Sequence, residues 1–200
     1  MLRRRLQISL ALTGRLTRLA ERLARRPAAP SDDASLIWAA VTVVIAPDPD
    51  SILLIRRADR PGDPWSGHMA LPGGRRAAAD QDLLATAIRE TREELGLELS
   101  RRGLVGSLDD VVPRTPVLPP VAVRPFVFVL PDRLPLTLNH EVAAARWVRL
   151  DDLQHPEHRH LVTLEVAGST RQVPAFRLDE GIVWGMTERI LADLIEQFRE

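Results

Sequence analysis

LPGGRRAAADQDLLATAIRETREELG, residues 71–96, joins a double glycine to a segment with the pattern of a helix. Residues that could face a core recur at helical spacing in this segment, at Leu84, Ile88, Thr91 and Leu95. The pattern predicts an amphipathic helix over residues 82–95, and Gly96 is a typical C-terminal stop. The glycines before the helix allow the backbone to approach a ligand closely.

Three glutamates fall within five residues of this helix: Glu90, Glu93 and Glu94. Residues three and four apart share a helix face, where like charges repel. The cluster is therefore either a solvated face or a site for a positive ligand, and its place beside the apolar stripe favours the ligand. Mg²⁺ suits it, because this ion takes a few carboxylates and keeps waters and phosphate oxygens as its other ligands. Arg89 lies four residues before Glu93 and is placed to pair with it.

All 27 positively charged side chains are arginines. Five of them flank the loops around the acidic helix: Arg56, Arg57, Arg60, Arg75 and Arg76. The planar guanidinium fork suits bidentate binding of phosphate. The candidates for substrate binding are Arg57, Arg60 and Arg75, together with Gly74. We expect two of the five arginines to contact substrate and some of the others to be ordinary surface charges.

Composition bounds the remaining possibilities. The 200 residues fit one domain with additions, and 45% hydrophobic residues suffice for a core. Because 27 basic and 27 acidic residues balance, the chain has no overall attraction to nucleic acid. The absence of cysteine excludes disulfides, thiolate chemistry and zinc–thiolate sites. No apolar run approaches the roughly 18 residues of a membrane span, so we expect a cytoplasmic protein without stable membrane insertion.

Residues 1–26 contain eight arginines and one glutamate. Leucines at helical spacing predict an amphipathic helix there: Leu12, Leu16, Leu19 and Leu23. Three interpretations stay open: a helix that packs on the domain or on a partner subunit, a membrane-surface helix, or a targeting segment. The first leaves room for a homodimer. Residues 27–35 are predicted to be a linker and residues 36–200 the main domain.

Strands and helices interleave along the main domain. β-rich runs predict strands at 36–45, 51–57, 68–74, 121–130, 143–150 and 171–178, and a C-terminal helix is predicted from Trp184. This order predicts an α/β fold with a mixed sheet between helices.

The histidines form a second candidate cluster: His155, His158 and His160. A metal tract is one interpretation. We favour an exposed polar loop, because neither cysteine nor a helical pair four residues apart accompanies them. His68 and His140 are interpreted as scaffold or rim of the main site.

Residues 89–97, RETREELGL, resemble the second half of the Nudix box, R-E-U-x-E-E-x-G-U with U aliphatic, except at Thr91. The first half departs: Asp80 follows Gly74 at the spacing where the box has glutamate, and one extra residue precedes Arg89. This longer box is similar to that of the coenzyme A pyrophosphatase branch of the Nudix family. The upstream segment 53–74, LLIRRADRPGDPWSGHMALPGG, also resembles that branch, although Ile55, Ala58 and Leu71 replace motif residues. In addition, the second arginine of the motif has no aligned match, and one extra residue separates Arg57 from Gly67.

The resemblance covers about residues 36–198 and implies an α/β/α sandwich with a mixed sheet. It implies that Glu90 and Glu94 bind Mg²⁺, or alternatively Mn²⁺, with Glu93 sharing the cluster and the carbonyl of Gly73 as a further ligand. Arg89 would orient a glutamate. The general base would be Glu90 or Glu141, and Glu141 is otherwise a loop acid with a structural hydrogen bond.

The implied reaction is attack of water on one phosphorus of a nucleoside diphosphate derivative, a small-molecule partner. Coenzyme A is the leading substrate, and ADP-ribose or a dinucleotide is the alternative. A catalytically silent Nudix-like binding domain is the alternative of another class, which the intact glutamates disfavour.

Overall fold

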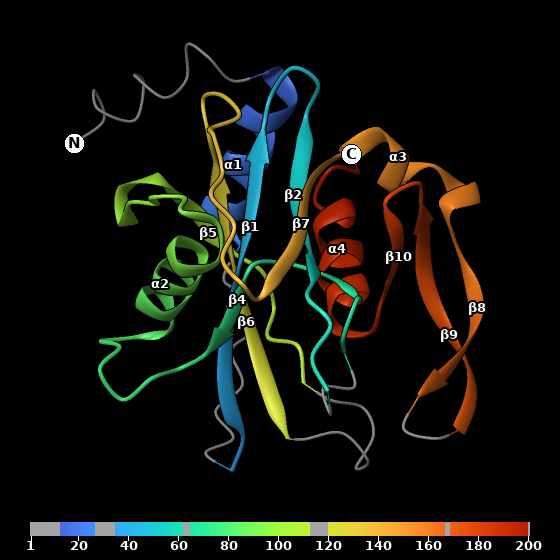
Figure 1. Cartoon of the computed structure of the whole chain (residues 1–200). Coiled ribbons are helices and arrows are strands. Elements are labelled where there is room, and N and C mark those ends of the chain that lie inside the picture. Colours follow the sequence, from blue (N-terminus) through green and yellow to red (C-terminus); the bar gives the residue numbers. More distant parts are fainter. Residues whose placement is uncertain (1–12, 27–34, 62–64, 113–119, 167–168, 200) are drawn as a thin grey trace.

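A mixed seven-stranded sheet forms the centre of the computed structural model, which describes residues 13–26, 35–61, 65–112, 120–166 and 169–199 (Figure 1). Its strands are β1 (Ile37–Ala46), β2 (Ser51–Arg57), β3 (Met69–Ala70), β4 (Gly73–Arg75), β5 (Leu104–Ser107), β6 (Val121–Val129) and β7 (Val142–Arg149). β1 and β6 run parallel over nine residue pairs, and the other pairings are antiparallel. The predicted mixed sheet is confirmed.

The sheet divides where β1 and β2 part. These strands pair only at Ile45 with Ile52 and at Ala46 with Ser51. Beyond that point β1 pairs with β4 and β6, whereas β2 pairs with β3 and β7. β3 and β4 are separated by two residues only, so the segment that ends in the double glycine crosses from one limb of the sheet to the other.

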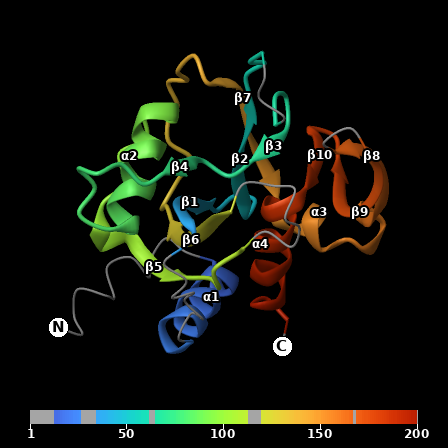
Figure 2. The same cartoon turned by 90° about the horizontal axis from the view of Figure 1, so that it is seen from below.

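Helices cover both faces of this sheet (Figure 2). α2 (Leu83–Leu95) packs on one face through Ala87 and Leu95, with Ala40 and Val44 of β1 in the same core cluster. The alternate β1 residues Val43 and Ile45 face the other cluster, because successive strand residues point to opposite faces. That second cluster includes α1 (Gly14–Arg25) and α4 (Gly185–Glu196). The arrangement confirms the predicted α/β sandwich.

A second, three-stranded antiparallel sheet flanks α4 at the right of Figure 1. It comprises β8 (Arg159–Val166), β9 (Ser169–Leu178) and β10 (Gly181–Trp184), and follows the short helix α3 (Leu150–Gln154). Of these three strands only β9 was predicted, from residue 171 to residue 178. The loop interpretation of the histidines is wrong for His160, which lies in β8 and pairs with Ala175. His155 and His158 precede β8 around a single 3₁₀ turn.

α1 belongs to the core of the domain. Leu16, Leu19 and Leu23 are all buried, and α1 packs against β5 and the C-terminal end of the chain. Arginines of the basic helix pair with the domain: Arg15 with Asp151, and Arg26 with Asp109 and Asp193. Leu12 and the predicted linker residues 27–34 lie outside the described residues. None of the described helices is both long and apolar enough to cross a membrane.

Candidate functional site

The acidic helix is fixed at both ends. Asp82 caps its start by accepting a hydrogen bond from the amide of Ala85 at 2.8 Å, and Gly96 ends it in the left-handed region at φ 62°. In its middle, the buried hydroxyl of Thr91 donates to the carbonyl of Ala87 and lies 2.8 Å from the hydroxyl of Thr42 on β1. Each hydroxyl has one hydrogen, so Thr42 donates to Thr91. This buried pair explains why threonine is accommodated where the Nudix box has an aliphatic residue.

The double glycine brings the backbone against the glutamates. The amide of Gly73 donates to Glu94 Oε2 at 2.9 Å, and Gly73 has a φ of 147°, which a side chain rarely adopts. A Cβ on Gly74 would lie 2.5 Å from the carboxyl carbon of Glu90. Both positions therefore require glycine: one for its backbone conformation and one for the space that Glu90 occupies.

Glu94 and Glu90 are two neighbouring acids of low exposure. Glu94 is 4% exposed, so it lies on the buried face of α2 and not beside it as the sequence predicted. Burial raises the pKa of Glu94 to about 8; the Gly73 amide opposes this rise, and the negative charges of Glu90 and Glu141 add to it. Burial also raises the pKa of Glu90, against the lowering effect of Arg89. A bound cation would relieve both effects.

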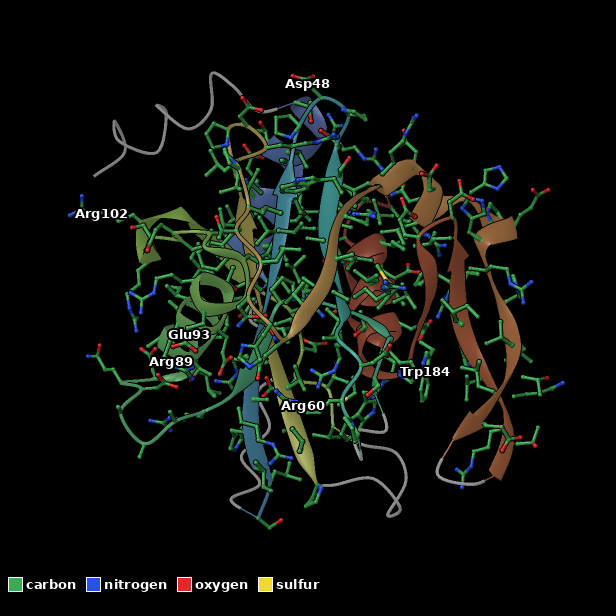
Figure 3. The ribbon with its side chains drawn as sticks, in the orientation of Figure 1. Asp48, Arg60, Arg89, Glu93, Arg102 and Trp184 are labelled. Carbon is green, nitrogen blue, oxygen red and sulfur yellow. The ribbon has the colours of Figure 1, made fainter. Side chains whose placement is uncertain are left out.

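Arg89 is the centre of the ion pairs on this helix. Its Nε and Nη2 donate to the two carboxylate oxygens of Asp80, each at 2.9 Å, and its Nη1 lies 2.9 Å from oxygens of Glu90 and Glu93 (Figure 3). Arg89 thus contacts both Glu90 and the more exposed Glu93. Asp80 is the functional residue that sequence reasoning noted only as a departure from the box.

Asp80 anchors Arg89 from a buried position. It also accepts hydrogen bonds from the amide of Ala77 at 2.8 Å and from the hydroxyl of Thr86 at 2.9 Å. The hydrogen bond from Arg89 is the main cause of a pKa well below the ordinary range for this carboxyl. The sequence did contain a signal for Asp80, because an acid stands six residues after Gly74. The extra residue before Arg89 obscured its pairing with that arginine.

Glu141 reaches the site from the other limb of the sheet. It directly precedes β7, and the β2–β7 pairing continues to a hydrogen bond from the amide of Ala58 to the Glu141 carbonyl at 2.8 Å. Its carboxylate lies 2.8 Å from Nη2 of Arg60. The two predicted residues, one catalytic and one for substrate binding, therefore contact each other directly.

The remaining predicted residues surround the cluster unevenly. Arg57, at the end of β2, lies near enough for its charge to oppose the raised pKa of Glu94. Arg75 is exposed, and its carbonyl accepts a hydrogen bond from Arg89 at 3.3 Å. His68 stacks edge-on against Trp184, with ring centroids 5.2 Å apart, and His140 is an exposed neighbour of Glu141.

The donor set fits Mg²⁺ better than a metal that needs a closed cage. Among the described residues, no three histidine, aspartate or glutamate side chains converge as a preformed metal site. Mg²⁺ binds proteins through one or two carboxylates and keeps waters and substrate phosphates as further ligands. Glu94, buried and oriented by the Gly73 amide, and Glu90, packed against Gly74, provide such a pair.

The chain belongs to the NUDIX domain family, whose model matches residues 37–164. The NUDIX domain and the similarity to Nudix hydrolases identify it as an enzyme of the pyrophosphohydrolase class, and divalent metal ions are typical of that class. A Nudix hydrolase of Yersinia pestis named NudL and described as uncharacterized is 28% identical over 158 residues, which cover 78% of this chain and 76% of that protein.

Other relatives extend the comparison. An uncharacterized protein of Schizosaccharomyces pombe, C14C4.10c, is 43% identical over 53% of this chain, and the match spans 34% of that protein's length. The crystal structure of a MutT/nudix family protein from Enterococcus faecalis aligns with a TM-score of 0.56 at 15% identity, covering 96% of this chain and 71% of that one. A NUDIX hydrolase from Alicyclobacillus acidocaldarius aligns at 0.55 and 19% identity, covering 80% and 91%. These two structures share the fold.

Proposed function

We propose that this enzyme hydrolyses the diphosphate bond of a nucleoside diphosphate derivative in an Mg²⁺-dependent reaction, and that coenzyme A is its substrate. One observation carries the proposal: two glutamates of low exposure, Glu90 and Glu94, lie against the two glycines of β4, whose backbone approaches them closely. A folded protein has no structural need for two such mutually repelling carboxylates, and a hard cation bound to phosphate would compensate their charge.

Glu90 and Glu94 would hold the Mg²⁺ ion, with the carbonyl of Gly73 as a further ligand and Glu93 beside them. Bound there, Mg²⁺ would polarise a phosphoryl oxygen and neutralise its developing charge. The chain's own residues set the geometry: the Gly73 amide fixes the orientation of Glu94, and Arg89 fixes Glu90 and Glu93. Asp80 in turn keeps Arg89 in place.

Water attacks one phosphorus, the bridging P–O bond breaks, and both products end in a phosphate. Either Glu90 or Glu141 accepts the proton of the attacking water. Glu90 is held by Arg89 next to the Gly74 backbone, whereas Glu141 is 42% exposed and open to solvent. The pH profiles of Glu90→Gln and Glu141→Gln separate the two: the variant that lacks the base loses the acidic limb of its kcat/KM profile.

Coenzyme A is favoured over ADP-ribose or a dinucleotide by residues 53–74, whose similarity to the coenzyme A pyrophosphatase branch includes Arg57, Gly67 and Pro72. In the structure, the end of β2 and the start of β7 bring this segment beside Glu141. A 3′-phosphate on one arginine fork should contribute on the order of 1.5–3 kcal/mol. We therefore expect a higher kcat/KM for coenzyme A than for its 3′-dephospho form.

A panel of diphosphate substrates with mass analysis of the products tests the proposal. Coenzyme A should give 3′,5′-ADP and 4′-phosphopantetheine with Mg²⁺ and neither product with EDTA. Glu94→Gln should abolish turnover, while Glu98→Gln, an equal charge change at an exposed residue after the helix, should not. If ADP-ribose or a dinucleotide is cleaved tenfold faster than coenzyme A, coenzyme A is not the substrate, although the proposed type of reaction still holds. Binding without any hydrolysis would identify the silent domain instead.

A further inference from the structure

Two loops that are far apart in sequence meet at a single exposed ion pair beside the carboxylate cluster. Arg60 Nη2 lies 2.8 Å from Glu141 Oε1 across 81 residues of sequence. The antiparallel pairing of β2 with β7 explains the meeting, because Arg60 follows the end of β2 and Glu141 precedes the start of β7. In the view of Figure 3, Arg60 lies between the labelled α2 residues and Trp184.

We propose that Arg60 is an exchange residue: in the substrate-free enzyme it pairs with Glu141, and a diphosphate anion displaces that carboxylate and takes its place on the guanidinium. The exchange binds the substrate and frees Glu141 beside Glu90 and Glu94 in one event. This inference rests on the proposed function and goes beyond it, because it couples one substrate-binding residue to one candidate base.

The main chain around the ion pair is fixed on both sides. Ser66 exchanges two hydrogen bonds with the backbone of Arg60, at 3.0 and 2.9 Å. The amide of Glu141 donates to the side chain of Asn139 at 2.8 Å, and the amide of Asn139 donates to the carbonyl of Glu94 at 3.0 Å. Exchange therefore requires a change of side-chain partner only, and Asn139 connects the Glu141 backbone to the helix that carries the cluster.

The ion pair itself is weak enough to be replaced. The side chains of Arg60 and Glu141 are 56% and 42% exposed, and exposed pairs of this kind add little to stability. A diphosphate presents more charge and more acceptor oxygens than one carboxylate, and the arginine fork matches its geometry. The anion is thus the stronger competitor for Arg60. The hydrogen bonds that connect the Glu141 amide through Asn139 to the Glu94 carbonyl keep the released carboxylate next to the cluster.

A double-mutant cycle on anion binding tests the exchange without relying on catalysis. The probe is inorganic pyrophosphate in EDTA, and its Kd is measured by calorimetry for wild type, Arg60→Gln, Glu141→Gln and the double variant. Arg146→Gln is the matched control, since Arg146 is exposed on the neighbouring strand β7 and makes the same charge change.

Arg60→Gln should weaken binding about tenfold, the loss of one charged hydrogen-bonding fork. Glu141→Gln should tighten it by up to about fivefold, because the competing partner is gone. The tightening should vanish when Arg60 is already Gln. Equal tightening in both backgrounds would show charge repulsion alone and overturn the exchange. Two other outcomes would also overturn the exchange: Arg146→Gln loses as much binding as Arg60→Gln, or the wild type shows no detectable binding.

Steady-state kinetics then distinguish a role of Arg60 in positioning the substrate from a purely structural role. With any substrate that the enzyme hydrolyses, Arg60→Gln should raise KM and lower kcat, whereas it should not lower kcat further in a Glu141→Gln background. Arg60→Lys should recover part of both constants. An additive loss of kcat would remove the positioning role. If the wild type hydrolyses no diphosphate, the proposed function fails, yet the pyrophosphate cycle still decides whether Arg60 exchanges partners.

Discussion

Asp80, in the loop before α2, pairs with Arg89, and Arg89 in turn pairs with Glu90. Asp80→Asn should lower the free energy of unfolding by about 2–3 kcal/mol, because Arg89 loses a charged partner at a buried position. It should also reduce kcat, since Arg89 would no longer hold Glu90. Urea denaturation and steady-state kinetics measure the two effects, and Asp179→Asn, at an exposed aspartate, is the control.

The pH dependence of the Asp80 contribution gives a second check. Arg89 holds the pKa of Asp80 below its ordinary value, so the stabilisation is present above about pH 4 and is lost as the pH falls further. The stability difference between wild type and Asp80→Asn should shrink at acidic pH. A difference that stays constant would mean that the ion pair contributes no stability.

Glu94 should produce the opposite trend. Its pKa of about 8 in the folded protein lies above the ordinary 4.5, so between these values the folded state binds more protons than the unfolded state. The stability of the metal-free protein should therefore fall as the pH rises from about 5 to about 8. Melting in EDTA across this range should show the fall for wild type and Glu98→Gln, and a flatter profile for Glu94→Gln. Added Mg²⁺ should flatten the wild-type profile, and an identical slope in all three proteins would contradict this origin.

At the scale of single residues, the sequence predicted the acidic cluster and its arginine but not how each side chain is held. Helical spacing was sufficient to group Glu90, Glu93 and Glu94. It could not show that Glu94 is buried, because burial depends on the strands that lie across the helix. The partner of Thr91 was equally hidden, since Thr42 lies 49 residues away and no local pattern connects two hydroxyls.

At the scale of elements, the contact between α1 and β5 depends on a glycine. A Cβ on Gly106 would lie 2.7 Å from the Cβ of Leu23, so a side chain there would push the helix away. Gly106→Ala should cost about 1–3 kcal/mol through overpacking and leave kcat unchanged. Gly103→Ala is the control, because its Cβ would meet Phe128 at an ordinary 3.7 Å. Equal stability of the two variants in urea would show that α1 does not press on β5.

The elements that sequence analysis missed share a physical cause. β5 is four residues long with every residue half-buried, so it shows no alternation. β8 carries exposed residues along much of its length, including Leu161 at 61% exposure, and its stability comes from pairing with β9. By contrast, β1, β2 and β6 have long β-rich runs with buried residues on both faces, and these strands were predicted within one or two residues of their ends.

At the scale of the whole molecule, the basic N-terminal helix is part of one core. Deleting residues 1–26 removes three buried leucines, and each such side chain contributes about 2–5 kcal/mol. Total stabilities are only about 5–15 kcal/mol. The truncated chain should therefore melt at least about 10 °C lower, while its folded fraction should keep Mg²⁺-dependent activity at low temperature, because the site lies beyond residue 35. Melting at the wild-type temperature would show that α1 contributes nothing to the domain.

The contact between α1 and the C-terminal segment also dictates when the protein can finish folding. Arg22 on α1 donates to the carbonyl of Gln197 at 2.7 Å, across 175 residues of sequence. Since 175 residues separate Arg22 from Gln197, α1 leaves the ribosome well before the C-terminal segment that it contacts. The hydrogen bond from Arg22 therefore cannot form until residue 197 has been made, and until then chaperones or other nascent chains can compete for this surface of α1.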